Sequence, residues 1–343
     1  MNPAVALALI ALLLLGPVVS RTVEEHIEIF FAAIGVVAMT LDGAWGWDVV
    51  ADAATVPLWI TIAVIVAGVV FDWMRDWMDR VMVRMRERIA LPLLCASAVF
   101  IIALLSAVIT ATVAALVLVE TAGLLRLSTG ARLRVVVAGC FAIGLGSSLT
   151  PLGGPLSTLA ANGLGLGATG LFNLLAPYVL PGMAACAILA GIFVRGDQAE
   201  GASPAVVLAL AHLSETLVGA LVRGMKIYIF IAALVLVGRA FAPLAAIYLP
   251  KLSREALFWA NITSAAMDNA TLVAVEIRAM DTARAREAII ALLVAGGMLI
   301  PGNIPNIVAA AALRIRAAEW ARLGVPIGLT LLGIYFALLE AAG

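Results

Sequence analysis

Apolar stretches of membrane-spanning length follow one another along most of this chain. A helix that crosses a bilayer needs about 20 mostly apolar residues. With 64% hydrophobic and 12% charged residues and a mean hydropathy of +1.14, a soluble domain of 343 residues would expose large apolar patches. The sequence therefore predicts an all-α polytopic protein of the inner (plasma) membrane, in contact with the lipid bilayer. The apolar stretches lie near 2–19, 27–41, 56–71, 89–125, 135–162, 171–194, 226–242, 256–277, 287–312 and 325–341.

Charge and cysteine content exclude other classes. The net charge is zero and no basic or acidic tail is present, which argues against a nucleic-acid partner. Cys95, Cys140 and Cys186 are far apart in apolar stretches, where a disulfide framework or a metal cage would need paired spacing. We expect no cofactor, and we read the cysteines as small buried residues.

Two apolar stretches do not fit a single crossing. The stretch 89–125 is too long for one span and has no loop to separate two, and 256–277 is interrupted at its middle by Asp268 and Asn269. Both predict re-entrant hairpins, in which two short helices meet at a polar tip inside the membrane.

Two other stretches are broken by proline and glycine. Thr150-Pro151-Leu152-Gly153-Gly154 interrupts 135–162, and Ile300-Pro301-Gly302-Asn303 interrupts 287–312. Each half of the chain thus carries a polar interruption followed by a helix break. Unwound backbone at membrane depth is tolerated only where it is buried in protein or lines a cavity, so the matched breaks predict the binding site of a secondary transporter. The alternative is a pair of kinks used only for packing.

The distribution of basic residues indicates that the two halves are inverted. If both arms of the first hairpin begin and end in the cytoplasm, most of the 21 Lys and Arg residues lie inside, as the positive-inside rule requires. The second hairpin then enters from the opposite side. The residues left outside are Arg239, Lys251, Arg254, Arg278, Arg284 and Arg286.

The predicted organisation is two inverted repeats, each with a re-entrant hairpin and a broken transmembrane helix, preceded by N-terminal helices. The segments are 1–71 as N-terminal helices, 72–88 as an interfacial helix, 89–194 as the first repeat, 204–223 as an interfacial linker helix and 226–343 as the second repeat.

Asp268 is the strongest single functional signal, because a carboxylate inside an apolar segment is costly and marks a functional site by default. Asn269 follows it, and both supply the hard oxygen ligands that sodium prefers. The alternative is that Asp268 only caps the second hairpin arm. The full set of candidate ion- or substrate-binding residues is Asp268, Asn269, Thr271, Thr110, Thr112, Ser148, Thr150, Gly153, Ser157, Gly302, Asn303 and Asn306.

Glu120 and Glu276 lie in the second arms of the two hairpins. A buried glutamate can relay protons, so both are candidate proton relays. Each is also close to a charged loop, so snorkelling to the interface explains them equally well.

The hairpin tips and broken helices resemble the ion transporter superfamily, which includes sodium/proton antiporters of the NhaD kind, arsenite efflux permeases and divalent-anion/sodium symporters. Within it, the chain is most similar to a small family described as predicted cation transporters. The resemblance implies a scaffold domain, which would comprise 1–71, a transport domain, an elevator-like movement and a homodimer. The residues that carry it are Asp268-Asn269-Ala270-Thr271, Thr150-Pro151-Leu152-Gly153-Gly154 and Pro301-Gly302-Asn303-Ile304-Pro305-Asn306.

The chain departs from the symporters, whose two tips carry Ser-Asn-Thr. The first tip reads Ile109-Thr110-Ala111-Thr112 and the second has Asp268 in place of the serine. The added carboxylate favours a cation over a dicarboxylate, so the first hypothesis is sodium/proton antiport through competition at Asp268. The alternative is a sodium-coupled transporter of a small anion. A channel suits the inverted repeats less well, and no hydrolase motif indicates an enzyme.

Overall fold

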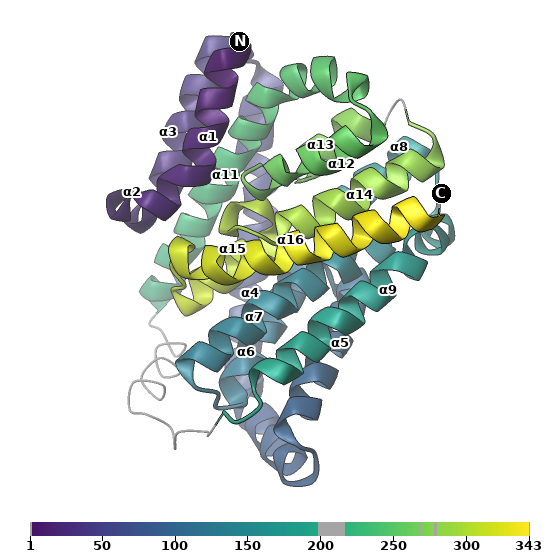
Figure 1. The fold of residues 1–343 in the computed structure, drawn as a ribbon. Helices are drawn as coiled ribbons and strands as arrows, with labels where there is room; N and C mark the ends of the chain where they lie inside the picture. The colour runs from purple at the N-terminus through teal and green to yellow at the C-terminus, as the bar shows by residue number, and fades with distance from the viewer. Residues whose placement is uncertain (1, 198–216, 268, 278–279, 343) are drawn as a thin grey trace.

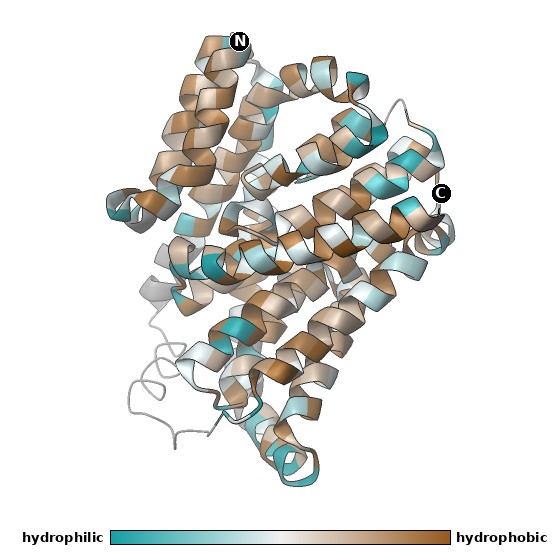
Figure 2. Cartoon of the chain, in the orientation of Figure 1, coloured by the Kyte–Doolittle hydropathy of each residue, from teal (hydrophilic) through white to brown (hydrophobic). Residues whose placement is uncertain are grey.

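The computed structural model describes residues 2–197, 217–267, 269–277 and 280–342, and throughout these ranges the secondary structure is helical, without a strand (Figure 1). Most turns of the helices are hydrophobic (Figure 2). The prediction of an all-α polytopic membrane protein is confirmed. Six helices of the described chain are long and apolar enough to cross a membrane, at Trp47–Val66, Leu91–Ile109, Thr129–Leu149, Ala168–Phe193, Gly224–Tyr248 and Ala317–Ala341.

The N-terminal helices pack with the long helix α11 (Leu217–Tyr248) at one side of the molecule (Figure 1). The rings of Phe31 and Phe230 meet edge to face at 5.2 Å between centroids, and the Tyr228 hydroxyl donates to the carbonyl of Ala54 at 2.9 Å. The N-terminal elements are α1 (Pro3–Val19), α2 (Arg21–Glu25), α3 (Ile27–Asp42) and α4 (Trp47–Arg88).

Helix α4 has 42 residues and is therefore about 63 Å long, roughly twice the thickness of the hydrocarbon core. Residues 72–88, for which the sequence suggests a separate interfacial helix, continue α4 without interruption. Residues 204–216 of the expected linker helix 204–223 lie outside the described residues. Its remaining residues, 217–223, form the start of α11.

The first hairpin consists of α5 (Leu91–Ile109) and α6 (Ala111–Leu124). Thr110 separates the two arms with φ 73° and ψ 151°, a positive φ that ends α5 and reverses the chain. At the open end of the hairpin, Arg86 Nη1 donates to the carbonyl of Leu125 at 2.9 Å, which joins the residues before and after the two arms. The chain therefore returns to the side from which it entered.

The second hairpin consists of α12 (Arg254–Ala260), the 3-10 turn η3 (Asn261–Ala265) and α13 (Asn269–Glu276). Asn261 Nδ2 donates to Glu276 Oε2 at 3.2 Å, so the two arms lie side by side. At the open end, Arg254 Nη2 donates to Glu287 Oε1 at 2.6 Å and fastens the hairpin to the following helix.

Both broken helices contain an interruption at the predicted proline and glycine positions. Prolines remove main-chain donors there, and glycines permit the unwinding. The first broken helix is α7 (Thr129–Gly146), η1 (Ser147–Leu149) and α8 (Pro155–Leu164), and the second is α14 (Thr282–Gly296), η5 (Ile300–Gly302) and α15 (Ile304–Leu313).

Helix α9 (Ala168–Phe193) shows how the two broken helices are oriented. Arg134, near the start of α7, donates to the carbonyl of Phe193, whereas the guanidinium of Arg286, near the start of α14, lies 4.8 Å from the centroid of the Tyr178 ring. Tyr178 and Phe193 are about 22 Å apart along α9. The two broken helices therefore begin at well-separated levels of the molecule.

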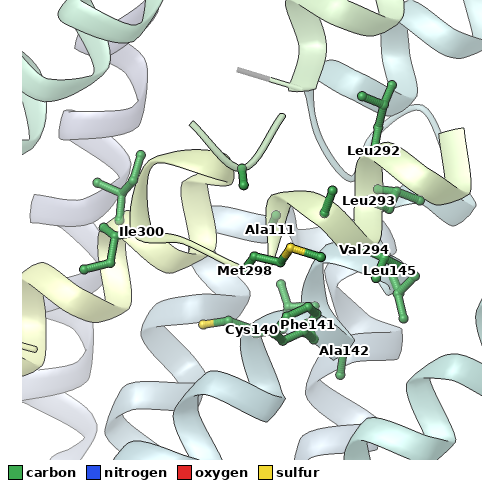
Figure 3. Packing of buried hydrophobic residues seen from close by; sticks show 14 of the residues in the cluster. Ala111, Cys140, Phe141, Ala142, Leu145, Leu292, Leu293, Val294, Met298 and Ile300 are labelled. Atoms are coloured by element: carbon green, nitrogen blue, oxygen red, sulfur yellow. The ribbon is translucent and has the colours of Figure 1, made fainter. Parts of the chain in front are cut away.

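Helix α7 lies at the centre of the protein and α4 at its edge. In the most apolar 18-residue window, 83% of the residues of Thr129–Leu149 are buried, against 11% for Trp47–Val66. Figure 3 shows Phe141 and Leu145 of α7 among the same buried side chains as Leu293 of α14 and Met298 of the second break. The last helix, α16 (Ala317–Ala342), covers this core, and its Trp320 Nε1 donates to the carbonyl of Gly297 at 3.1 Å.

Replacement of Gly146 by alanine is expected to lower the stability of the fold. A Cβ atom there would overlap the main-chain carbonyl of Ala103 in α5, and a main-chain group moves only at a cost of about 1–3 kcal/mol. Thermal unfolding in detergent, followed by tryptophan fluorescence, should show a lower midpoint for Gly146→Ala. The matched control is Gly333→Ala in α16, where nothing lies within 4 Å of the new Cβ and the midpoint should stay or rise. Equal midpoints for Gly146→Ala and the wild type would contradict the close packing of α5 on α7.

Candidate functional site

A cavity of about 260 Å³ lies where both hairpin turns and both helix breaks meet. Such a volume is comparable to that of a small ligand pocket and is large enough for an ion with several waters. Its polar lining comes from Thr110, Thr112, Ser147, Ser148 and Ser157 in the first half and from Asn269 and Asn303 in the second, and the glycines Gly144, Gly153, Gly154 and Gly302 bring main chain close to it.

Most of the candidate residues named from sequence line this one cavity, although they come from four separate elements. The exceptions stand beside it or fall outside the described chain. Asn306 bonds to the second break, and Thr150 Oγ1 donates to the carbonyl of Ala107 in the first hairpin. Asp268 and the side chain of Thr271 lie outside the described residues. The candidates that line the cavity are Thr110, Thr112, Ser148, Gly153, Ser157, Asn269, Gly302 and Asn303.

In the first half, the serine hydroxyls at the break donate to nearby main-chain carbonyls. Ser147 Oγ donates to Gly144 O at 3.0 Å, and Ser148 Oγ donates to Leu145 O at 2.7 Å. Ser157 Oγ donates to Gly154 O at 2.8 Å and accepts from the N–H of Gly154 at 3.1 Å. The hydroxyl donors of these three serines are therefore satisfied, and their oxygens keep lone pairs that can accept.

In the second half, two amide side chains hold the break but keep their oxygens unpaired. Asn269 Nδ2 donates to Leu292 O at 3.0 Å, and Asn306 Nδ2 lies 2.8 Å from both Gly296 O and Leu299 O. The Oδ1 atoms of Asn269 and Asn306 are buried and have no hydrogen-bond partner. An unpaired buried acceptor costs about 1–3 kcal/mol, and a bound cation would remove that cost.

The amide side chains of Asn269 and Asn306 both lie against Gly296. Asn306 contacts its carbonyl, and a Cβ atom at Gly296 would overlap the amide of Asn269 and crowd the carbonyl of Gly302. Glycine is therefore required for the approach of these oxygen-bearing groups. Throughout the described ranges, no group of three or more His, Cys, Asp or Glu comes together, and the oxygens at this break belong to amides and main-chain carbonyls.

Each half contributes one arm to the packing of the other. Helix α6 of the first hairpin packs on α15, with Ala115 and Leu116 against Val308. Helix α13 of the second hairpin packs on α8, with Ile277 against Gly163. The cavity is thus lined by both halves rather than by either one.

The structure resolves one ambiguity over the two glutamates. Glu276 has 1% of its surface exposed and bonds to Asn261, so it does not snorkel to an interface. Glu120 is half-buried in α6. Asn261 is not among the residues predicted from sequence, although its polar side chain inside the apolar stretch 256–277 is the same kind of signal as Asp268. Nor is Trp59 of α4, which lines the cavity and carries no local marker.

The fold and its spans define a multi-pass helical membrane protein with a cavity between its two hairpin turns and two helix breaks. A family model described as a protein of unknown function (DUF1646) matches residues 3–341. Because the match covers nearly the whole chain, the protein belongs to this family. A search of curated proteins finds no match.

Thiol labelling tests which positions reach the cavity. The native cysteines have at most 1% of their surface exposed, so the folded wild-type protein in detergent should not react with a maleimide. Thr110→Cys should react, because Thr110 is exposed and lines the cavity. Asn306→Cys, at a fully buried position, should react only after unfolding. Equally fast labelling at the two introduced cysteines would contradict this geometry.

Proposed function

We propose that this protein is a secondary active cation transporter of the inner membrane, and that it exchanges sodium for protons. The observation that carries the proposal is the cavity between two hairpin turns and two helix breaks, with two buried amide oxygens that lack a partner. Irregular backbone from both halves around one central site is typical of secondary transporters.

The arrangement of the halves supports alternating access. The hairpin α5–α6 with the broken helix α7–α8 has a counterpart in the hairpin α12–α13 with α14–α15, and the two open ends are tied by Arg86 and Arg254. We interpret these halves as inverted repeats. By the resemblance to the ion transporter superfamily, they form the transport domain, the N-terminal helices form the scaffold of a homodimer, and the movement is elevator-like.

The chemistry of the second break supports a hard cation. Sodium binds to oxygens, and Asn269 Oδ1, Asn306 Oδ1 and the nearby main-chain carbonyls supply them. Asp268 precedes Asn269 in the sequence, and we assign its carboxylate to the same cation. A carboxylate that binds either sodium or a proton couples the two fluxes, because it cannot hold both at once.

A sodium-coupled anion transporter is the second candidate, and one observation favours it. The first turns of α8 and α15 both line the cavity at Pro155 and Ile304, and Asn303 makes no side-chain cap to α15. Free N–H groups at helix N-termini attract anions. Against it, the lining contributed by the described residues includes neither Lys nor Arg, so an anion would find no compensating charge there.

Ion flux in proteoliposomes distinguishes these functions. With a pH dye inside, a sodium gradient should move protons through the wild-type protein, and Asp268→Asn should abolish the exchange. Asn269→Ala and Asn306→Ala should each raise the sodium concentration for half-maximal flux by about tenfold, which corresponds to a loss of about 1.4 kcal/mol of binding. Asn173→Ala is the matched control, because this amide is exposed on α9 and does not line the cavity.

A wild-type protein that moves no protons under sodium, lithium or potassium gradients would exclude antiport. Sodium-dependent uptake of a labelled anion by the same vesicles would then establish the second candidate.

A further inference from the structure

The second hairpin contains a buried carboxyl group that the sodium site does not use. Glu276 has 1% of its surface exposed, and its Oε2 accepts from Asn261 Nδ2 at 3.2 Å. Its other oxygen, Oε1, is buried without a hydrogen-bond partner. The Asn261 amide also lies 3.4 Å from the carbonyl of Ala288 in α14. The pair therefore joins both hairpin arms and the broken helix.

The pair lies close to the unpaired amide oxygens of the proposed cation site. Asn261 bonds to the carbonyl of Ala288, and Asn269 bonds to the carbonyl of Leu292 on the same helix. These two carbonyls are one turn apart, or about 6 Å along the axis of α14. Along α13 itself, Asn269 and Glu276 are about 10 Å apart. Over this distance, inside a medium of low dielectric constant, a negative charge on Glu276 still affects the binding of a cation.

The first hairpin lacks such a pair. Ser106 and Ser264 occupy equivalent positions, because each donates to a carbonyl of its own broken helix, Ile143 and Leu292 respectively. When the two hairpins are aligned on these serines, Ala103 corresponds to Asn261 and Leu118 corresponds to Glu276. Both first-hairpin residues are apolar and buried, so a hairpin of this kind does not need the carboxyl group to fold.

The charged groups on the elements packed around α13 have partners of their own. On α14, Glu287 pairs with Arg254 of α12 and with Arg286, and Arg284 donates to the carbonyl of Leu252. On α11, Arg239 pairs with Asp52 and Asp48, and Lys226 pairs with Glu28. Helix α8 carries no charged residue, and Glu255 of α12 is exposed. Asp268, Arg278 and the side chain of Arg223 on α11 lie outside the described residues. Within the described chain, the only polar partner of Glu276 is therefore neutral.

We propose that Glu276 is a proton-binding group of the transport cycle, which gives up its proton when sodium binds beside Asn269 and Asn306. The inference rests on the proposed function. A buried carboxylate without a positive partner is costly, so the carboxyl group keeps its O–H bond while the cation site is empty. When the cation binds, its positive charge stabilises the carboxylate, the O–H bond breaks and the proton leaves to water. Asn261 then donates to the charged form. The step involves no change in oxidation state.

The number of protons released per bound sodium tests this inference. Sodium is added to the purified protein in weakly buffered detergent with a pH dye, and sodium binding is measured in parallel. Linkage requires that a group which loses a proton on binding contributes about one released proton at a pH between its pKa in the sodium-bound protein and its pKa in the free protein. Glu276→Gln should therefore release about one proton fewer per sodium than the wild type. Glu276→Asp, which keeps a carboxyl group, should restore most of the release.

Glu319→Gln is the matched control. Its carboxylate is partly exposed and already has a positive partner, Arg316, so proton release should equal that of the wild type. Asp268→Asn should weaken sodium binding at every pH.

The outcomes separate the two proposals. Proton release that is unchanged in Glu276→Gln while sodium still binds would overturn the role of Glu276 and leave the cation site intact. Sodium binding that releases no protons in the wild type would overturn both the role of Glu276 and the proton exchange at Asp268, and only the cation site would stand. A wild-type protein that binds no sodium at any pH would overturn both.

Discussion

Hydrocarbon offers no hydrogen bonds to unwound backbone, and this constraint governs the centre of the molecule. Each helix break is held by the hairpin of its own half. In the first half, the N–H of Ala111 donates to the carbonyl of Gly153, and Thr150 bonds to Ala107. In the second half, Asn269 and Asn306 donate to the carbonyls of α14 and of the break. The hairpins and the broken helices therefore have to meet, and the cavity lies where they do.

The two halves satisfy this constraint with different chemistry. The first uses hydroxyl groups of Ser147, Ser148 and Ser157, which bond within their own turns. The second uses amides, and an amide that donates to a carbonyl still carries an acceptor oxygen. The Oδ1 atoms of Asn269 and Asn306 are consequently left unpaired in a buried place. This difference makes the second break the side of the cavity that is suited to a cation.

The position of the cavity depends on long helices that contribute little chemistry. Helix α4 reaches it with Trp59, while its far end holds the base of the first hairpin through Arg86. Helix α9 contacts the starts of both broken helices through Phe193 and Tyr178. These contacts fix the broken helices relative to their surroundings.

The sequence contains ten apolar stretches, whereas six helices of the described chain are long and apolar enough to span a membrane. The sequence by itself determined the helical class, the two chain reversals and the places of both helix breaks. These features depend on local properties: apolar length, the missing N–H of proline and the freedom of glycine at positions such as Pro151 and Pro301. Local patterns predicted a separate interfacial helix over 72–88. The charges of this segment make it more polar but do not end the helix, so α4 continues past residue 71. Only the tertiary structure decided which oxygens stay unpaired and that Glu276 is buried beside Asn261. The physical reason is that an amide or carboxyl group can bond in several directions, and the neighbours that helix packing brings to it select one of them.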